Sequence, residues 1–298
     1  MKEKIDSIHK TVLLNETIDG LNLHDGALVL DGTFGGGGHS LEILKRFRNV
    51  KIVAIDQDKS AYEKAKSKFV GLDSSLAFIN ANFREVGNLK KKDFDGIILD
   101  LGLSSDQLEN SGRGFSFMKN EPLLMTMKEN PSPEDVTAMD IVNSWGENNI
   151  ADIIYGYGEE KFSRRIARAI VDARQKKKFE TTFDLVKVVN ESVPASYRKG
   201  RINCATKTFQ ALRIATNDEL GALQEGLAKG FEAMKVGGRM SVISFHSLED
   251  RIVKNFFRDK QKENQAKLIN KKPITASDEE LKNNPRSRSA KLRVLEKI

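Results

Sequence analysis

The chain has 298 residues, of which 39% are hydrophobic, enough to bury a sizeable core in one large domain or one domain with an insertion. Its formal net charge of +7 permits contact with polyanions such as nucleic acids but does not by itself indicate it. The single cysteine, Cys204, excludes an intramolecular disulfide and favours a reducing compartment. Since no apolar run has the length of a signal peptide or a membrane span, we expect a soluble, cytoplasmic protein.

Strand-like and helix-like segments alternate in the N-terminal third of the chain. Segments 40–47, with Ser40 as its N-cap, and 58–69 have helical spacing. Apolar runs that predict buried strands cover residues 27–31, 51–56, 76–79 and 95–100. Continuous apolar strands that alternate with helices indicate a parallel sheet covered by helices on both faces.

The alternation stops between residues 107 and 205, where helix patterns occur without a convincing buried strand. Helices are expected at 159–174 and at 182–193, the second capped by Thr181 and Thr182 and ended before Pro194. The strand signal then returns beyond this region. The later segments are a helix at 218–235, a strand at 239–244, a weakly patterned surface loop at 260–284 and a closing strand at 290–297.

These patterns predict an α/β fold interrupted by an all-helical insertion. The α/β domain comprises residues 1–106 and 207–298, and the insertion comprises residues 107–206.

A glycine-rich segment, Asp-Gly-Thr-Phe-Gly-Gly-Gly-Gly-His-Ser, covers residues 31–40. Glycines between a strand and a helix let the backbone approach a ligand closely, and the helix N-terminus offers unpaired N–H groups. Asp56 ends the next strand, where a carboxylate can accept hydrogen bonds from both hydroxyls of a ribose. Together these features predict an adenosine-containing ligand without specifying which one.

Three ligand classes compete for this loop. A P-loop needs Gly-Lys-Ser/Thr where the chain has Gly38-His39-Ser40, and the G-x-G-x-x-G spacing of a dinucleotide site is absent. S-adenosylmethionine has no pyrophosphate and tolerates a looser loop, and Asp31 is suitably placed for its amino-acid end. The four histidines have no metal-ligand spacing, so we expect no metal.

Asp100 ends the fourth predicted strand, where open α/β sheets place their ligand crevice. Amino-group methyltransferases usually carry Asp, Asn or Ser at this point, followed by two prolines and an aromatic residue. Here the acid is present, but the two prolines and the aromatic residue are missing.

Longer motifs cover nearly the whole chain in order. They are HKTVLL (9–14), DGTFGGGGHS (31–40), DLGLSS (100–105), RGFSF (113–117), YGEE (157–160), RRIARAI (164–170), TFQALRI (208–214), SFHSLEDR (244–251) and NPRSRSAKLR (284–293). With these motifs the chain resembles the ribosomal RNA small subunit methyltransferase H family. That family methylates the exocyclic N4 of a cytidine in the decoding region of 16S rRNA.

The resemblance implies a class I, Rossmann-like S-adenosylmethionine-dependent methyltransferase sheet with an inserted helical domain that recognises the substrate. The implied partner is 16S rRNA or the small ribosomal subunit, and both a monomer and a homodimer remain open. The residues that the resemblance assigns to the cofactor are Gly37, Gly38, His39, Asp56, Phe83, Asp100 and Gln107.

The chain departs from the family pattern in the insertion. Leu124, Thr126 and Lys128 replace two acids and an arginine of the usual Pro-Leu-Asp-Met-Arg-Met-Asp, and Asn203-Cys204 replaces His-Pro. A divergent paralogue acting on another RNA, a small molecule or a protein therefore stays open. A non-catalytic RNA-binding assembly factor is a further alternative, although the retained Asp56 and Asp100 argue against it.

The cytosine amino nitrogen is a poor nucleophile because its lone pair is delocalised, so an acceptor for its N–H would assist in-line methyl transfer. Asp100 is the first candidate for this catalytic role. Phe115 and Phe117 could stack on an unpaired base, or they could anchor the core of the insertion. Two basic clusters could bind phosphate, or could be solvated surface. They are Arg164, Arg165, Arg168, Arg174 and 176–178 in the insertion, and Arg286, Arg288, Lys291 and Arg293 near the C-terminus.

Overall fold

The computed structural model describes residues 10–72, 75–90, 92–104, 107–108 and 110–298. The chain divides into two compact units. We call Met1–Gly102 with Leu220–Ile298 the sheet unit, and Leu103–Glu219 the helical unit. The border after the insertion lies beyond the expected residue 206. The reason is that α10 (Thr206–Asn217) contributes Phe209 and Leu212 to the core of the helical unit.

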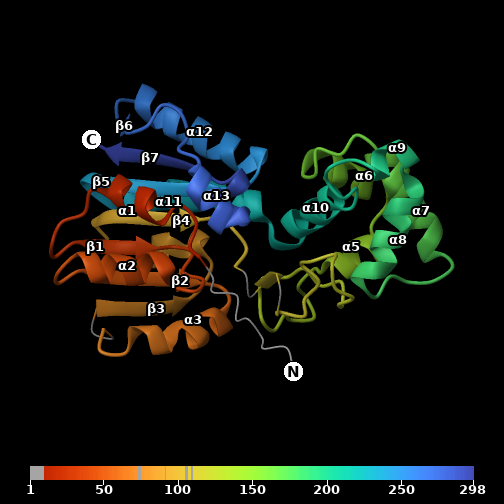
Figure 1. Cartoon of the computed structure of the whole chain (residues 1–298), viewed down its shortest axis with the longest axis horizontal. Coiled ribbons are helices and arrows are strands. Elements are labelled where there is room, and N and C mark those ends of the chain that lie inside the picture. The colour runs from red at the N-terminus through yellow and green to blue at the C-terminus, as the bar shows by residue number, and fades with distance from the viewer. Residues whose placement is uncertain (1–9, 73–74, 91, 105–106, 109) are drawn as a thin grey trace. The chain divides into compact units, whose positions relative to one another are not determined.

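The sheet unit contains one seven-stranded sheet in the order β3-β2-β1-β4-β5-β7-β6, seen from bottom to top in Figure 1. Its strands are β1 (Leu28–Asp31), β2 (Lys51–Asp56), β3 (Leu76–Asn80), β4 (Phe94–Asp100), β5 (Met234–Ser244), β6 (Ala266–Leu268) and β7 (Lys291–Lys297). The strands from β3 to β5 pair in parallel, as predicted. The predicted closing strand, β7, instead runs antiparallel between β5 and β6, so the sheet is mixed.

Alternate residues of the central strands face opposite sides of the sheet, as the two-residue period of a strand requires. Val29 and Ile98 pack in one core with α1 (Leu14–Leu21), α2 (Gly38–Arg46), α3 (Lys59–Ala65) and the 3₁₀ turn η1 (Lys66–Phe69). Their neighbours Leu30 and Ile97 pack in a second core with η3 (Phe83–Asn88), α11 (Glu219–Ala233) and α12 (Ser247–Lys262). Helices therefore cover both faces, and the predicted α/β fold with a helical insertion is confirmed.

Two local predictions were wrong. Ser40 is not an N-cap: α2 begins at Gly38 with Gly37 as its cap, and Ser40 lies inside the helix. The stretch 260–284 is not one long loop, because it holds the end of α12, strand β6 and helix α13 (Asp278–Asn283), with the 3₁₀ turn η4 (Pro285–Ser289) after it. Strand β6 forms only by pairing with β7, a long-range partner that a local pattern does not reveal.

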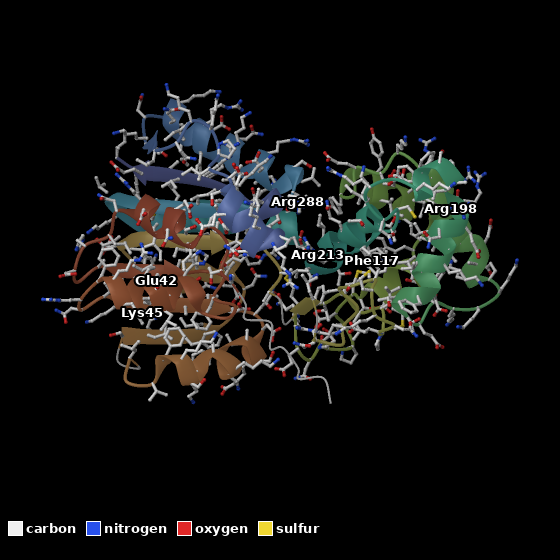
Figure 2. The ribbon with its side chains drawn as sticks, in the orientation of Figure 1. Glu42, Lys45, Phe117, Arg198, Arg213 and Arg288 are labelled. Carbon is white, nitrogen blue, oxygen red and sulfur yellow. The ribbon has the colours of Figure 1, made fainter. Side chains whose placement is uncertain are left out.

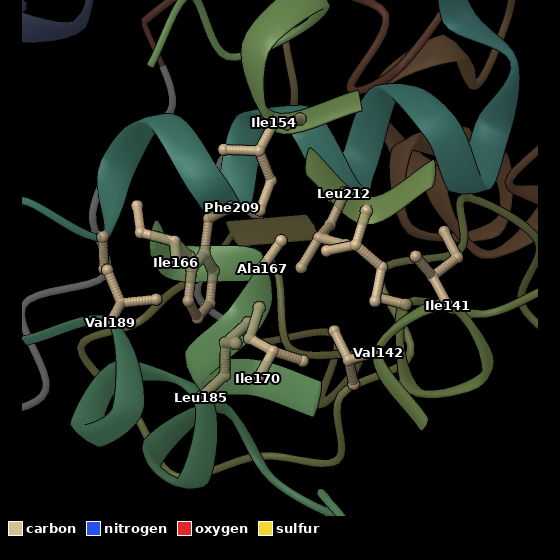
Figure 3. Packing of buried hydrophobic residues seen from close by; sticks show 14 of the residues in the cluster. Ile141, Val142, Ile154, Ile166, Ala167, Ile170, Leu185, Val189, Phe209 and Leu212 are labelled. Carbon is tan, nitrogen blue, oxygen red and sulfur yellow. The ribbon is translucent and has the colours of Figure 1, made fainter. Parts of the chain in front are cut away.

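The helical unit buries an apolar core between its helices (Figure 3). The helices are α5 (Ala138–Ser144), α6 (Glu147–Gly156), α7 (Ser163–Arg174), α8 (Thr182–Ser192), α9 (Ala195–Arg198) and α10. Thr181 caps α8 through a capping box with Asp184, as the sequence predicted. Helix α7 begins four residues later than predicted, because Glu159 has a positive φ of 49°.

Across the described part of the chain, no helix is long and apolar enough to cross a membrane.

Candidate active site

Three aspartates end three adjacent strands of the sheet: Asp31 ends β1, Asp56 ends β2 and Asp100 ends β4. Strand β1 pairs in parallel with both β2 and β4, so the three carboxyl ends meet at one edge. Strands β2 and β3 follow β1 on one side of it, whereas β4 and β5 lie on its other side. The strand order therefore reverses between β1 and β4, and this edge is the topological switch point of the sheet. Ligands of open α/β sheets bind at such a point.

The glycine loop joins the end of β1 to α2 and lies against the two neighbouring strands. The N–H of Gly32 donates to the carbonyl of Ile98 at 2.9 Å, and the N–H of Phe34 donates to the carbonyl of Ile55 at 3.0 Å. The N–H of Gly35 donates to the Asp56 carboxylate at 2.7 Å. The loop is therefore held directly beside the acid that was predicted to bind a ribose.

Two of the glycines are required by space, and Gly37 is required by its backbone conformation as well. Gly37 has a φ of +72°, and a Cβ there would lie 2.7 Å from the ring of Phe34. A Cβ at Gly38 would overlap the hydroxyl of Thr11. Side chains at either position would push the start of α2 away from the strand ends.

Asp31 is almost fully buried, with 1% of its surface exposed. Its carboxylate accepts hydrogen bonds from the Ser40 hydroxyl at 2.6 Å and from the Thr33 N–H at 3.3 Å. Burial raises its pKa to about 6, since the hydrogen bonds from Ser40 and Thr33 only partly offset the loss of water. Burial also raises the pKa of Asp56 to about 6, against hydrogen bonds from the N–H groups of Asp58 and Gly35.

Asp100 has the most strongly raised pKa of the three. Its N–H donates to the Thr33 hydroxyl at 2.6 Å, and its carboxylate accepts from the Gly102 N–H at 3.2 Å. Burial raises its pKa to about 7, and the negative charges of Asp31 and Glu249 add to the effect. Glu249 is itself 3% exposed and accepts hydrogen bonds from the N–H groups of Phe245 and His246 at the start of α12.

Phe83, the predicted adenine neighbour, is the first residue of η3. The half-buried Phe83 ring packs directly on Gly226 of α11, where any side chain would overlap the ring. On its other contact, the Cβ atom of Phe83 lies 3.4 Å from the position that a Cβ atom would take on Gly32. Asn82, directly before it, donates to the side chain of Gln57, next to Asp56, at 3.3 Å. The structure therefore brings Phe83 to the edge of the sheet where Asp56 and the glycine loop lie.

The remaining predicted residues belong to different units. His39 is buried in the first turn of α2, beside the loop. Gln107 belongs to the helical unit, where its side-chain oxygen accepts a hydrogen bond from the Ser104 N–H at 2.9 Å. The sheet unit thus assembles six of the seven predicted cofactor residues.

Sequence reasoning missed two residues that support this site, Thr33 and Ser40. Their hydroxyls hold the main chain of Asp100 and the carboxylate of Asp31, respectively. A signal was available, since both residues belong to the glycine-rich segment 31–40. The sequence pattern does not show to which aspartate each of them bonds.

The edge suits S-adenosylmethionine chemically. The cofactor carries a sulfonium and an ammonium group, and three crowded carboxylates favour such positive charges. Asp56 can accept from ribose hydroxyls, and Asp31 lies beside the helix start. Residues 31–40 include no lysine or arginine to neutralise a triphosphate.

Several predicted substrate contacts have a structural role in the helical unit. Phe115 is 7% exposed, and the labelled Phe117 packs edge-on against Phe209 with ring centroids 5.5 Å apart (Figure 2). The core interpretation is therefore the correct one for these two rings. The Arg174 guanidinium donates to the carbonyls of Val142 and Trp145 at 3.1 and 2.7 Å, at the end of α5.

The C-terminal basic cluster also divides into two kinds of residue. Arg293 is 8% exposed, and its guanidinium pairs with Asp250 at 2.7 Å. Lys291 pairs with the same carboxylate at 3.3 Å. Arg286 and Arg288 are exposed on η4.

Two of the departures from the family pattern, Thr126 and Cys204, are buried in the helical unit, whereas Lys128 is exposed. Thr126 is 4% exposed, Lys128 pairs with Asp135, and the Cys204 thiol contacts the Asn190 side chain at 2.8 Å. Burial raises the pKa of Cys204, which agrees with its predicted structural role.

Comparison with known proteins identifies the family. The model of the MraW methylase family matches residues 6–298. Proteins named ribosomal RNA small subunit methyltransferase H from Lactobacillus johnsonii and Heliobacterium mobile are 43% and 44% identical, over 97% of this chain and 99% of each relative. A solved rRNA methylase from Streptococcus thermophilus aligns over 97% of this chain and 98% of its own, with a TM-score of 0.46 and 10% identity. On the family match and the close relatives, the chain belongs to the MraW methylase family and is an S-adenosylmethionine-dependent methyltransferase.

Proposed function

We propose that this methyltransferase acts on 16S rRNA in the cytoplasm and methylates the exocyclic N4 of one cytidine in the decoding region. The observation that carries the proposal is the set of three carboxylates at the switch point, with Asp100 at the end of β4. The relatives at 43% and 44% identity, named as methyltransferases of small-subunit rRNA, support the choice of RNA.

Bound S-adenosylmethionine supplies an activated methyl group on a positively charged sulfur. Asp56 would accept the ribose hydroxyls while the Gly35 N–H holds its carboxylate in place at 2.7 Å. Phe83 would pack on the adenine, and Gly37, Gly38 and His39 would line the path of the cofactor along the loop. Gln107, which belongs to the helical unit, is the seventh residue that the family resemblance assigns to the cofactor.

Asp100 would act on the cytosine amino group. Its ionised carboxylate would accept a hydrogen bond from the amino N–H as the nitrogen loses conjugation with the ring. The nitrogen lone pair would then be free to form the bond to the methyl carbon. The Thr33 hydroxyl and the Gly102 N–H fix the main chain and carboxylate of Asp100, so that little reorganisation is needed. The target base must be unpaired to present its amino edge.

The helical unit would recognise the RNA. Its altered segment, with Leu124, Thr126 and Lys128, is held by Asn217, whose amide donates to the Met125 carbonyl at 2.7 Å and accepts from the Met127 N–H at 2.8 Å. Substrate choice would therefore depend on a segment whose main chain is held in place by these hydrogen bonds to Asn217.

Nucleoside mass spectrometry of 16S rRNA tests the proposal in a host with and without the gene. We expect N4-methylation at one decoding-region cytidine to be lost and then restored by the wild type but not by Asp56→Ala. Lys187→Glu, an exposed change on α8, is the matched control that should restore it. An unchanged methylation pattern in the deletion host would refute the assignment.

A further inference from the structure

The helical unit has a cavity of about 350 Å³ that lies between the end of α6 and the start of α7. Residues of both helices and of the turn that joins them line it. They include Tyr155, Lys161, Phe162, Ser163, Arg164 and Arg165. This volume is at the lower end of the range for small-ligand sites, enough for one nucleotide-sized group.

The cavity has a positive wall in a unit that is neutral as a whole. Residues 103–219 contain 17 lysines and arginines and 17 aspartates and glutamates, so the net charge of +7 belongs entirely to the sheet unit. Lys161, Arg164 and Arg165 face only one acid, Asp152, among the lining residues. Three cations at one cavity therefore reflect local placement and not a generally basic surface.

Two of these cations are available to a ligand. Arg164 and Arg165 are exposed, and neither forms a salt bridge with the residues that the structure describes. Arg168, one turn further along α7, differs because its guanidinium lies 3.5 Å from Glu147. Helix α7 begins beside the cavity, and Phe162 at its N-cap provides no side-chain hydrogen bond to the first turn. Guanidinium groups and a helix start both favour phosphate.

Two aromatic side chains, those of Tyr155 and Phe162, also line the cavity, and we call them its aromatic wall. Tyr155 on α6 has 68% of its surface exposed, unusual for so large a ring. Phe162 packs edge-on against Tyr197 with centroids 4.9 Å apart, and the Lys161 ammonium lies over both rings at 5.1 and 5.4 Å. The Tyr197 hydroxyl donates to the buried Glu160 at 2.5 Å, which fixes the ring against which Phe162 packs. Arg198, which follows Tyr197, is exposed on α9 (Figure 2).

We infer that this cavity binds one nucleotide of a single-stranded segment of the RNA substrate, with its base on Tyr155 and its phosphate at Arg164 and Arg165. An exposed aromatic ring beside unpaired arginines fits single-stranded RNA, because every base can stack and every nucleotide brings a phosphate. An acidic peptide would use the cations but would leave the aromatic wall without a partner. The identity of the RNA rests on the proposed function.

Binding of a labelled single-stranded RNA of about 12 nucleotides to the full-length protein tests the inference, by fluorescence anisotropy over a salt series. The double change Arg164→Glu with Arg165→Glu should raise Kd by about 10-fold or more. It should also lower the slope of log Kd against log salt concentration by about 2. Tyr155→Ala should raise Kd between about 5-fold and 100-fold, whereas Tyr155→Phe should keep the wild-type affinity. The matched control, Lys187→Glu with Lys199→Glu, changes the same charge at exposed residues of the same unit that neither line the cavity nor belong to the two basic clusters.

Equal losses in the arginine pair and the lysine control, or no loss in either, would overturn the inference. The inference would also be overturned if a polyglutamate peptide displaced the labelled RNA as well as unlabelled RNA does. Methyl transfer to 16S rRNA by the wild type separates the two proposals. If the wild type binds the RNA through the cavity but transfers no methyl group, the proposed function fails and the nucleotide site stands. If it transfers the methyl group and the arginine pair leaves KM unchanged, the site fails and the function stands.

Discussion

Replacing Asp31 with asparagine should stabilise the ligand-free sheet unit at neutral pH. Asp31 is 1% exposed with a pKa raised from 3.8 to about 6. Asparagine can keep both hydrogen bonds, since its oxygen can accept from the Thr33 N–H and its amide can donate to the Ser40 hydroxyl. The substitution therefore removes the buried charge with little change in shape.

The size of the effect follows from the raised pKa. Above about pH 6 the folded state holds an ionised carboxylate that the unfolded chain already ionises near pH 4, and this difference costs about 3 kcal/mol at 1.36 kcal/mol per pH unit. Below about pH 4 the group is protonated in both states and the cost disappears. Asp31→Asn should thus raise the free energy of unfolding by about 3 kcal/mol at pH 7.5 and by less than about 1 kcal/mol at pH 4.

Hydrogen exchange in peptides from β1 and β4, measured at several pH values, reports the stability of the sheet unit. Fluorescence of Trp145, the single tryptophan, reports the helical unit and serves as an internal control. Ser40→Ala should have the opposite effect, because it removes the hydrogen-bond donor to the ionised Asp31 carboxylate. We expect it to lower the free energy of unfolding by about 1.5–3 kcal/mol at pH 7.5. A gain from Asp31→Asn of the same size at pH 4 and pH 7.5 would refute the reasoning.

Four further outcomes are expected. Gly38→Ala should destabilise the protein by about 1–3 kcal/mol and weaken cofactor binding, measured by thermal denaturation and calorimetry, because its Cβ overlaps the Thr11 hydroxyl. For the wild type, kcat should rise with pH through a midpoint near 7, because Asp100 must lose its proton to accept the amino N–H against the charges of Asp31 and Glu249. Asp100→Asn should lower kcat by about 100-fold and flatten that profile; an unchanged midpoint would exclude Asp100. Phe209→Ala should cost about 3–5 kcal/mol in the helical unit, measured by Trp145 fluorescence in denaturant, and a loss below about 1 kcal/mol would contradict the packing in Figure 3.

The elements of the site that are local in sequence could be predicted from it. Strands β1, β2 and β4 are short apolar runs that end in acids, and the glycine loop follows the first of them directly. A buried strand, a glycine turn and a terminal acid each leave a signal within a few residues. For this reason Asp31, Asp56 and Asp100 could be assigned to one edge before any tertiary contact was known.

The features that depend on distant partners could not be predicted in this way. Nothing local shows that β7 runs antiparallel between β5 and β6, because strand pairing depends on contacts between separate segments. Phe115 and Arg174 have the same residue types as ligand-binding groups, yet one is buried in the core and the other binds the end of α5.

The sequence by itself determined the family, the order of the sheet's first four strands along the chain and the acids that end three of them. Only the tertiary structure decided the chemistry of those acids, since Ser40, Thr33 and Glu249 reach them from other segments. The pKa of Asp100 depends on burial and on charges that lie far away in sequence. Burial and electrostatic interactions are properties of the packed chain, and a one-dimensional pattern does not contain them.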